Sequence, residues 1–200
     1  MRCRITVLAV TIPLAAALTV SGGIAQAKPL PAAGVMQALL LTKEEMVKAT
    51  GYAGQLADAG GSSCTDTDDG GRDCVFGAQP ADWNNAATYP YMVVISGFPT
   101  TSASAAHWRD HNLKPQPWNG ETITIVATTA KSITYTSVPA DLQQMASAWT
   151  SIKGKQGIMM AACGANSQAP DLKAVADCSR KLATALVAKV KAKRPKTPLA

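Results

Sequence analysis

The chain has 200 residues, of which 47% are hydrophobic and 16% charged, and its formal net charge is +6. This length and hydrophobic content predict one domain of ordinary size with a buried core. Its basic residues are not interleaved with aromatic ones, which argues against a nucleic-acid-binding surface.

Residues 1–27 are predicted to be a secretory signal peptide. Two arginines precede an apolar run over residues 5–20, and Ala-Gln-Ala at 25–27 is typical of a cleavage site. Pro13 interrupts the run, which is too short to anchor the chain in a membrane. No cysteine follows the run, so a lipoprotein acylation site is not available. We therefore expect an exported, soluble chain that begins at Lys28 and has no transmembrane anchor.

Residues 28–38 contain two prolines and several small residues, which predict a flexible lead-in. The domain itself is predicted over residues 39–191, followed by a basic flexible tail over residues 192–200. Its first helix has a capping box of Thr42 and Glu45, and it stops at Gly51.

The next part of the chain alternates between loops, strands and one helix. Residues 52–73 are polar and glycine-rich, which predicts a loop, and the first clear strand begins at Cys74. A stronger strand is predicted over residues 91–95, followed by an alanine-rich helix over residues 101–112. Residues 121–138 alternate threonine with isoleucine in two segments, which predicts a β-hairpin.

Two further helices flank one more strand. Residues 157–163 form an unbroken apolar run, typical of a strand covered on both faces. The last helix is predicted over residues 171–190, with apolar residues at steps of three, four and seven. Four helices and about five strands that do not strictly alternate predict a single α+β domain with a mainly antiparallel sheet. The helix before the last strand would begin at Pro139 and share one face among Leu142, Met145, Trp149 and Ile152.

Four cysteines remain after removal of the signal peptide, and an even number in an exported chain predicts two disulfides. Four cysteines allow three pairings, of which we favour the local one, Cys64–Cys74 and Cys163–Cys178. Cys74 begins a strand after a hairpin-like loop. Cys178 lies on the buried face of the last helix, toward the strand that ends at Cys163.

Positive charge is concentrated at the C-terminal end, where seven lysines and arginines lie in the last 21 residues without any acidic residue. Part of this charge complements the C-terminal end of a helix dipole. The rest predicts a weak contact with anionic envelope polymers or lipid headgroups. The residues expected to make this contact are Lys189, Lys191, Lys193, Arg194 and Lys196.

Several stretches resemble a known family of actinobacterial exported proteins. They are Val-Val-Ile-x-Gly-Phe-Pro-Thr from Val93, the alanine-rich helix after it, Glu-Thr-Ile-Thr-Ile from Glu121, and the late strand that closes in Ala-Cys-Gly. Over about residues 40–190, the chain is similar to the extracellular sensor domain of PknH-type mycobacterial receptor kinases. The family tends to have a cysteine where this chain has Asn119 and Gly120, so its disulfide wiring does not carry over. The resemblance implies an exported α+β sensor or binding module with a cleft and no catalytic residues.

His107 and His111 are the only histidines, and their spacing of four on a helix can chelate zinc. The zincin motif requires glutamate where this chain has Trp108, and no third ligand is evident. The acidic stretch over residues 65–71 fails the EF-hand spacing, so a solvated hairpin tip is favoured over a calcium site. We predict no metal and no cofactor.

Trp83, Trp108 and Trp118 are the candidate ligand contacts. Trp83 and Trp118 are predicted in loops, where an aromatic side chain can face a cleft or a partner. Packing over the edge of the sheet is the competing explanation.

No serine-hydrolase motif is present, and two of the three glutamates lie in the first turn of a capped helix. The favoured function is a non-catalytic binding or sensor-like module at the cell envelope. Its ligand would be a small amphipathic molecule, an envelope polymer or an envelope protein. The alternative is an envelope-acting hydrolase whose site is built around His107 or His111.

Overall fold

The structure is a computed structural model that describes residues 29–81, 90–117, 120–140, 145–165 and 170–194, together with 197 and 199. The predicted signal peptide therefore lies outside the described residues. The helices are α1 (Ala33–Gln37), α2 (Lys43–Thr50), α3 (Thr101–His107), the π-helix η2 (Trp108–Asn112) and α4 (Leu172–Lys193). The strands are β1 (Leu56–Asp66), β2 (Arg72–Pro80), β3 (Tyr91–Gly97), β4 (Thr122–Thr128), β5 (Ser132–Val138), β6 (Ala146–Lys153) and β7 (Gly157–Ala165).

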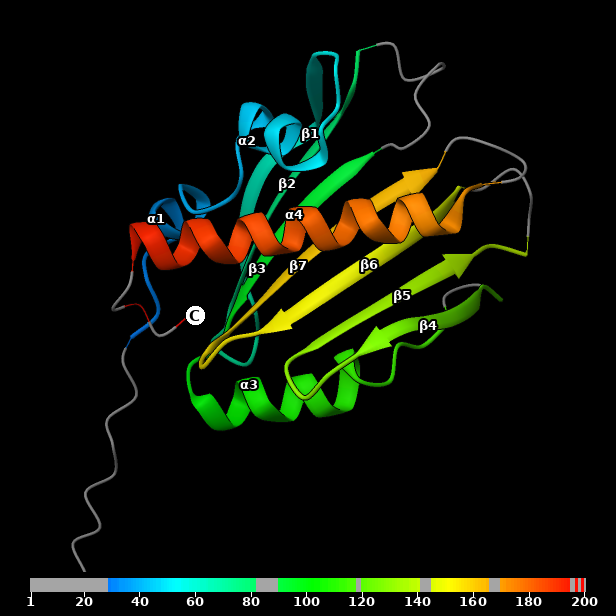
Figure 1. Cartoon of the computed structure of the whole chain (residues 1–200). Coiled ribbons are helices and arrows are strands. Elements are labelled where there is room, and N and C mark those ends of the chain that lie inside the picture. Colours follow the sequence, from blue (N-terminus) through cyan, green and yellow to red (C-terminus); the bar gives the residue numbers. More distant parts are fainter. Residues whose placement is uncertain are drawn as a thin grey trace, which may run out of the picture.

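All of these strands belong to one antiparallel sheet in the order β1-β2-β3-β7-β6-β5-β4 (Figure 1). Two meanders, β1–β3 and β4–β7, are joined where β3 pairs with β7, from Tyr91 opposite Cys163 to Gly97 opposite Gly157. The predicted α+β domain with a mainly antiparallel sheet is confirmed, but the described residues form seven strands rather than about five.

β1 is one of the two strands that the sequence did not predict. It occupies the polar, glycine-rich stretch that was expected to be a loop, and Leu56 is its only buried residue. Gly60 and Gly61 have φ angles of 91° and 71° where its pairing with β2 shifts register. Pairing with β2, rather than burial, therefore makes this segment a strand.

β6 occupies the later part of the stretch that was predicted as a helix over residues 139–152, so the helix prediction was wrong there. Residues 141–144 of that stretch lie outside the described residues. The strand pairs with β5 on one side and β7 on the other. Its small residues Ala146, Ala148 and Thr150 alternate toward α4, whereas Trp149 points to the opposite face. Helical spacing of the large apolar residues was outweighed by pairing with two neighbouring strands.

α4 crosses one face of the sheet and covers the main core (Figure 1). Asp171 caps the helix, because its carboxylate accepts hydrogen bonds from the backbone N–H groups of Lys173 and Ala174. Within the described ranges, no helix combines the length and apolarity needed to cross a membrane. The inward side chains of α4 are at most 7% exposed: Val175, Cys178, Leu182, Leu186 and Val190.

Two local disulfides form, with the pairing favoured from the sequence. Cys64 and Cys74 lie directly opposite each other in β1 and β2, and Cys163 of β7 is bridged to Cys178 of α4. Their sequence separations are 10 and 15 residues. Loop-closure entropy in the unfolded chain makes each bridge worth about 3 kcal/mol.

The opposite face of the sheet carries a smaller cluster beneath α3 and η2. Trp108 is 3% exposed and packs with Phe98, Ile133 and Ile158. Farther along this face, Met160 is only partly buried. This face is therefore covered less completely than the face beneath α4.

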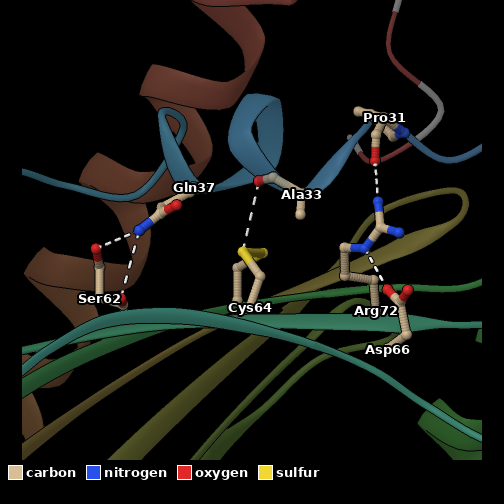
Figure 2. Close-up of a disulfide and its surroundings, with 8 residues drawn as sticks. Pro31, Ala33, Gln37, Ser62, Cys64, Asp66 and Arg72 are labelled. Carbon is tan, nitrogen blue, oxygen red and sulfur yellow. Dashed lines mark hydrogen bonds and ion pairs between the residues drawn. A yellow bond between two sulfur atoms is a disulfide. The ribbon is translucent and has the colours of Figure 1, made fainter.

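The segment predicted as a flexible lead-in contains α1, which lies over β1 and β2 (Figure 2). A guanidinium nitrogen of Arg72, Nη1, donates to the carbonyl oxygen of Pro31 at 2.7 Å. Gln37 Nε2 donates to the Ser62 hydroxyl. Cys64 Sγ lies 3.5 Å from the Ala33 carbonyl oxygen, in a contact that is not a hydrogen bond because a disulfide sulfur carries no proton. These contacts attach residues 31–37 to the sheet.

The predicted flexible tail also contributes to the core. Leu199 is fully buried against Gly97 and Gly157, which are partners in the β3–β7 pairing. A Cβ atom on Gly157 would lie 2.7 Å from the Leu199 carbonyl oxygen. Glycine at this position therefore makes room for the C-terminal residues.

Candidate functional site

The tryptophans predicted as ligand contacts do not form a described site. Trp83 and Trp118 lie outside the described residues. Trp108 is 3% exposed and packed between η2 and the sheet, within the small cluster on that face. Trp149 is half-buried in β6, where it lies opposite Tyr135 of β5.

His107 and His111 lie side by side, with ring centroids 4.6 Å apart, and Phe98 lies 4.9 Å from His107. Burial lowers the pKa of His107, and His111 lowers it further, while Asp73 and Asp69 oppose the shift. No hydrogen bond contributes to this shift, so no described carboxylate orients His107 as it would in a hydrolase triad. Among the described residues, no group of three His, Cys, Asp or Glu side chains is placed to hold a metal.

Two carboxylates at the β1–β2 hairpin, those of Asp66 and Asp69, have partners within the hairpin. Asp66 pairs with Arg72 across the hairpin, and the Arg72 hydrogen bond lowers the pKa of Asp66. Asp69 accepts hydrogen bonds from the Thr67 hydroxyl and the Gly71 N–H, and the Thr67 bond makes the larger contribution to lowering the pKa of Asp69. The turn is therefore a hydrogen-bonded hairpin tip, as the sequence favoured.

The described basic residues near the C-terminal end differ in their surroundings. Lys189 Nζ donates to the Leu40 carbonyl oxygen and to Glu45 Oε2, each at 2.6 Å. The Lys189 side chain is 11% exposed and fastens α4 to α2. Lys196 lies outside the described residues. The remaining members, Lys191, Lys193 and Arg194, are exposed.

A groove of about 560 Å³ lies where the last turns of α4 meet the β4–β5 and β6–β7 turns. We call it the lysine groove, because Lys131, Lys153, Lys155 and Lys191 line it and no acidic residue of the described ranges does. Lys131 comes from the β4–β5 turn, Lys153 and Lys155 from the end of β6 and the turn after it, and Lys191 from α4. The volume lies in the range of small-molecule sites, roughly 300–1,000 Å³.

The floor of the lysine groove is apolar. Ile152 of β6 and Met159 of β7 are direct partners in the sheet and face α4, which contributes Val187. Met159 is 1% exposed and belongs to the main core, while Ile152 and Val187 are partly buried. The groove therefore offers hydrocarbon surface beside several cations.

Backbone hydrogen bonds hold the two turns that carry three of these lysines. The Lys153 N–H donates to the Lys131 carbonyl oxygen at 2.8 Å, which ties one turn to the other. The Gly154 N–H donates to the Gly157 carbonyl oxygen at 2.7 Å and closes the β6–β7 turn around Lys155. The sheet therefore determines where these residues lie.

None of the four lysines forms an ion pair with another residue of the described ranges. Lys191 lies in the last turn of α4, where a cation complements the helix dipole. That explanation does not extend to Lys131 and Lys155, which are exposed in turns. Such an arrangement can hold an anionic group next to hydrocarbon.

Three other hollows among the described residues are smaller, and each includes an acidic residue. The one beside the β1–β2 hairpin tip, of about 260 Å³, contains Asp66 and Arg72. The hollow beside the Cys163–Cys178 bridge has a volume of about 360 Å³ and contains Asp177 and Lys181. The hollow between α2 and β1, of about 270 Å³, contains Glu44.

Sequence reasoning missed the lysine groove because only the topology brings positions 131, 153, 155 and 191 together. Lys131 lies within residues 121–138, which were predicted only as a β-hairpin, and Lys153 and Lys155 directly follow the stretch that was predicted as a helix. The one local signal was Lys153-Gly154-Lys155, two cationic residues separated from the apolar strand only by Gln156.

No protein-family model matches the chain, and a search of curated proteins finds no match. Among solved structures, the chain is similar to the crystal structure of the extracellular domain of PknH from Mycobacterium tuberculosis. The TM-score is 0.56 at 14% sequence identity, and the match covers 83% of this chain and 99% of that one. The resemblance noted in the sequence is therefore confirmed as a shared fold.

Proposed function

We propose that this chain is a non-catalytic binding or sensor-like module that acts outside the cytoplasm, at the cell envelope. The observation that carries the proposal is the lysine groove, which combines an apolar floor with uncompensated cations. The two disulfides suit an oxidising compartment. The fold shared with the extracellular domain of PknH supports the same assignment. An amphipathic ligand fits this lining better than a substrate that requires acid–base chemistry.

The second candidate is an envelope-acting hydrolase with a site around His107 or His111. In its favour, the lowered pKa of His107 keeps more of the imidazole neutral, as a general base requires. Against it, His107 packs on Phe98 and His111 and has no orienting carboxylate among the described residues. The binding module is therefore the better-supported function.

The double variant His107→Ala/His111→Ala of the secreted protein separates the two candidates. For a binding module, we expect no hydrolysis of cell-wall or lipid ester substrates by the unmodified chain. The double variant should keep the thermal stabilisation that envelope lipid extracts produce. Turnover that disappears in the double variant, with an unchanged circular dichroism spectrum, would establish the hydrolase. If neither lipid nor polysaccharide fractions stabilise the protein, ligand binding is overturned.

A further inference from the structure

We propose that the lysine groove binds a single-chain anionic lipid. The headgroup lies among Lys131, Lys155 and Lys191, and the alkyl chain lies over Ile152 and Met159. This inference rests on the proposed binding function, and it adds the class of ligand and the residues that select it.

Three of the four lysines are placed to contact the headgroup. Lys153 lies opposite Ile158 in the β6–β7 pairing, and Ile158 packs in the cluster beneath η2. Because strand side chains alternate between faces, the Lys153 side chain extends to that opposite face, and its backbone borders the groove. The other three ammonium groups come from two turns and a helix end. A phosphate or carboxylate has enough acceptor sites to accept a charge-assisted hydrogen bond from each.

The walls of the groove change character along its length. Val187 and Lys191 are four residues apart in α4, so they lie on the same side of the helix, one turn from each other. The helix wall is therefore apolar first and cationic toward its end. On the sheet side, Ile152 and Met159 precede and follow the turn that carries Lys155. A ligand that matches both walls has its charge at the turns and its hydrocarbon toward the core.

Other ligand classes use only half of this lining. An anionic polymer would need a continuous cationic track and would gain nothing from the apolar floor. A neutral amphiphile would bury its hydrocarbon but leave three lysines without an anion. Charge complementarity and the buried Met159 together favour one molecule that carries both features.

The test is NMR of the secreted chain labelled with [¹³C-methyl]methionine, with dodecyl phosphate as the probe at concentrations below micelle formation. Met159 lies in the floor, and the next residue, Met160, faces the opposite side of the sheet. We expect a saturable shift of the Met159 methyl resonance and none of the Met160 resonance. Inorganic phosphate alone and dodecyl maltoside should each bind at least tenfold more weakly than dodecyl phosphate, because each matches only one half of the lining.

Two triple variants with equal loss of charge locate the anion contact. Lys131→Gln/Lys155→Gln/Lys191→Gln should bind dodecyl phosphate at least tenfold more weakly. The control is Lys114→Gln/Lys173→Gln/Lys181→Gln, which removes three exposed lysines elsewhere and should bind like the unmodified chain.

Each contrary outcome overturns a named part of the proposal. Equal binding by both triple variants would show that the three lysines do not contact the ligand. Equal binding of phosphate and dodecyl phosphate would show that the apolar floor does not contribute to binding. Binding to phosphatidylglycerol vesicles without binding to monomeric dodecyl phosphate would show that the residues of the lysine groove contact a membrane surface and do not bind a single lipid. A shift of Met160 in place of Met159 would overturn this site but leave the proposed binding function standing. The proposed function itself fails only if envelope fractions do not stabilise the protein at all.

Discussion

The two faces of the sheet differ in how completely they are covered and fastened. On one face, α4 lies over β6 and β7 and is held by the Cys163–Cys178 bridge and by the Lys189–Glu45 pair (Figure 1). On the other face, α3 and η2 cover a small cluster around Trp108. The difference indicates that most of the stability lies beneath α4. The lysine groove borders this well-packed side.

Truncation of a core side chain on each face should show the largest difference between the two faces in the free energy of unfolding. Leu186 is fully buried beneath α4, and Leu186→Ala should lower the free energy of unfolding by about 3 kcal/mol. The matched variant on the other face is Leu113→Ala. Leu113 is only partly buried at the end of η2, so its loss should be about 1 kcal/mol. Chemical denaturation measures both, and equal losses would contradict the comparison.

Removal of the two disulfides tests whether the bridge to α4 does more than close a loop. Cys163→Ala/Cys178→Ala and Cys64→Ala/Cys74→Ala should each lower the free energy of unfolding by about 3 kcal/mol, because loop entropy depends only weakly on length. The measurement is denaturant unfolding under non-reducing conditions. A much larger loss for the first pair would show that docking of α4 itself depends on the bridge.

The ion pair beneath α4 should make that side sensitive to acid. Burial alone would raise the pKa of Glu45, but hydrogen bonds from Lys189 and from the Thr42 N–H outweigh it and lower the pKa below 4.5. This contribution to stability is therefore present above about pH 4.5 and is lost as the pH falls through the folded-state pKa. Glu45→Gln should cost about 1 kcal/mol at pH 7. The cost should become smaller as the pH falls through the folded-state pKa, because protonation of the carboxyl removes the charged pair, and a cost that does not change with pH would exclude the charged pair as the cause.

The face beneath α3 should respond closer to neutral pH, with the smallest effect. Burial lowers the pKa of His107 in the folded chain, so below about pH 6.5 the unfolded chain binds more protons and stability falls with the pH. Between pH 7.5 and 5.5, we expect His107 to lower the Tm by about 1–2 °C. His107→Leu should reduce the decrease over this interval by that amount. An unchanged pH dependence in the variant would rule out His107 as the source.

Part of the fold could be predicted because some segments carry a local signal strong enough to stand alone. Thr42 and Glu45 form the capping box of α2 as expected, and Gly51 ends that helix with a φ of 76°. The periodic apolar residues of α4 predicted a helix, and the unbroken apolar run of β7 predicted a strand, and both elements are present. Both disulfides followed from the same elements, since residues 10 and 15 apart meet through local structure.

The predictions that failed have one physical cause. In each case, the structure of a segment is determined by a partner that lies far away in the sequence. β6 is a strand because β5 and β7 supply hydrogen bonds on both sides, although its large apolar residues have helical spacing. β1 is a strand because β2 lies beside it, although its own residues are polar. Leu199 is buried because two glycines, 60 residues apart in the chain, are paired beneath it.

The sequence by itself determined the well-capped helices, the apolar strands, the local disulfides and the concentration of positive charge near the C-terminal end. Only the tertiary structure decided which of those charges are available. The Lys189 side chain is mostly buried and pairs with the carboxylate of Glu45. Lys191, two residues farther along α4, instead lines the lysine groove together with residues of two cationic turns. The periodicity of apolar residues shows which side of a helix is buried. Whether a lysine beside that side pairs with a carboxylate or lines a groove depends on the elements that pack against the helix.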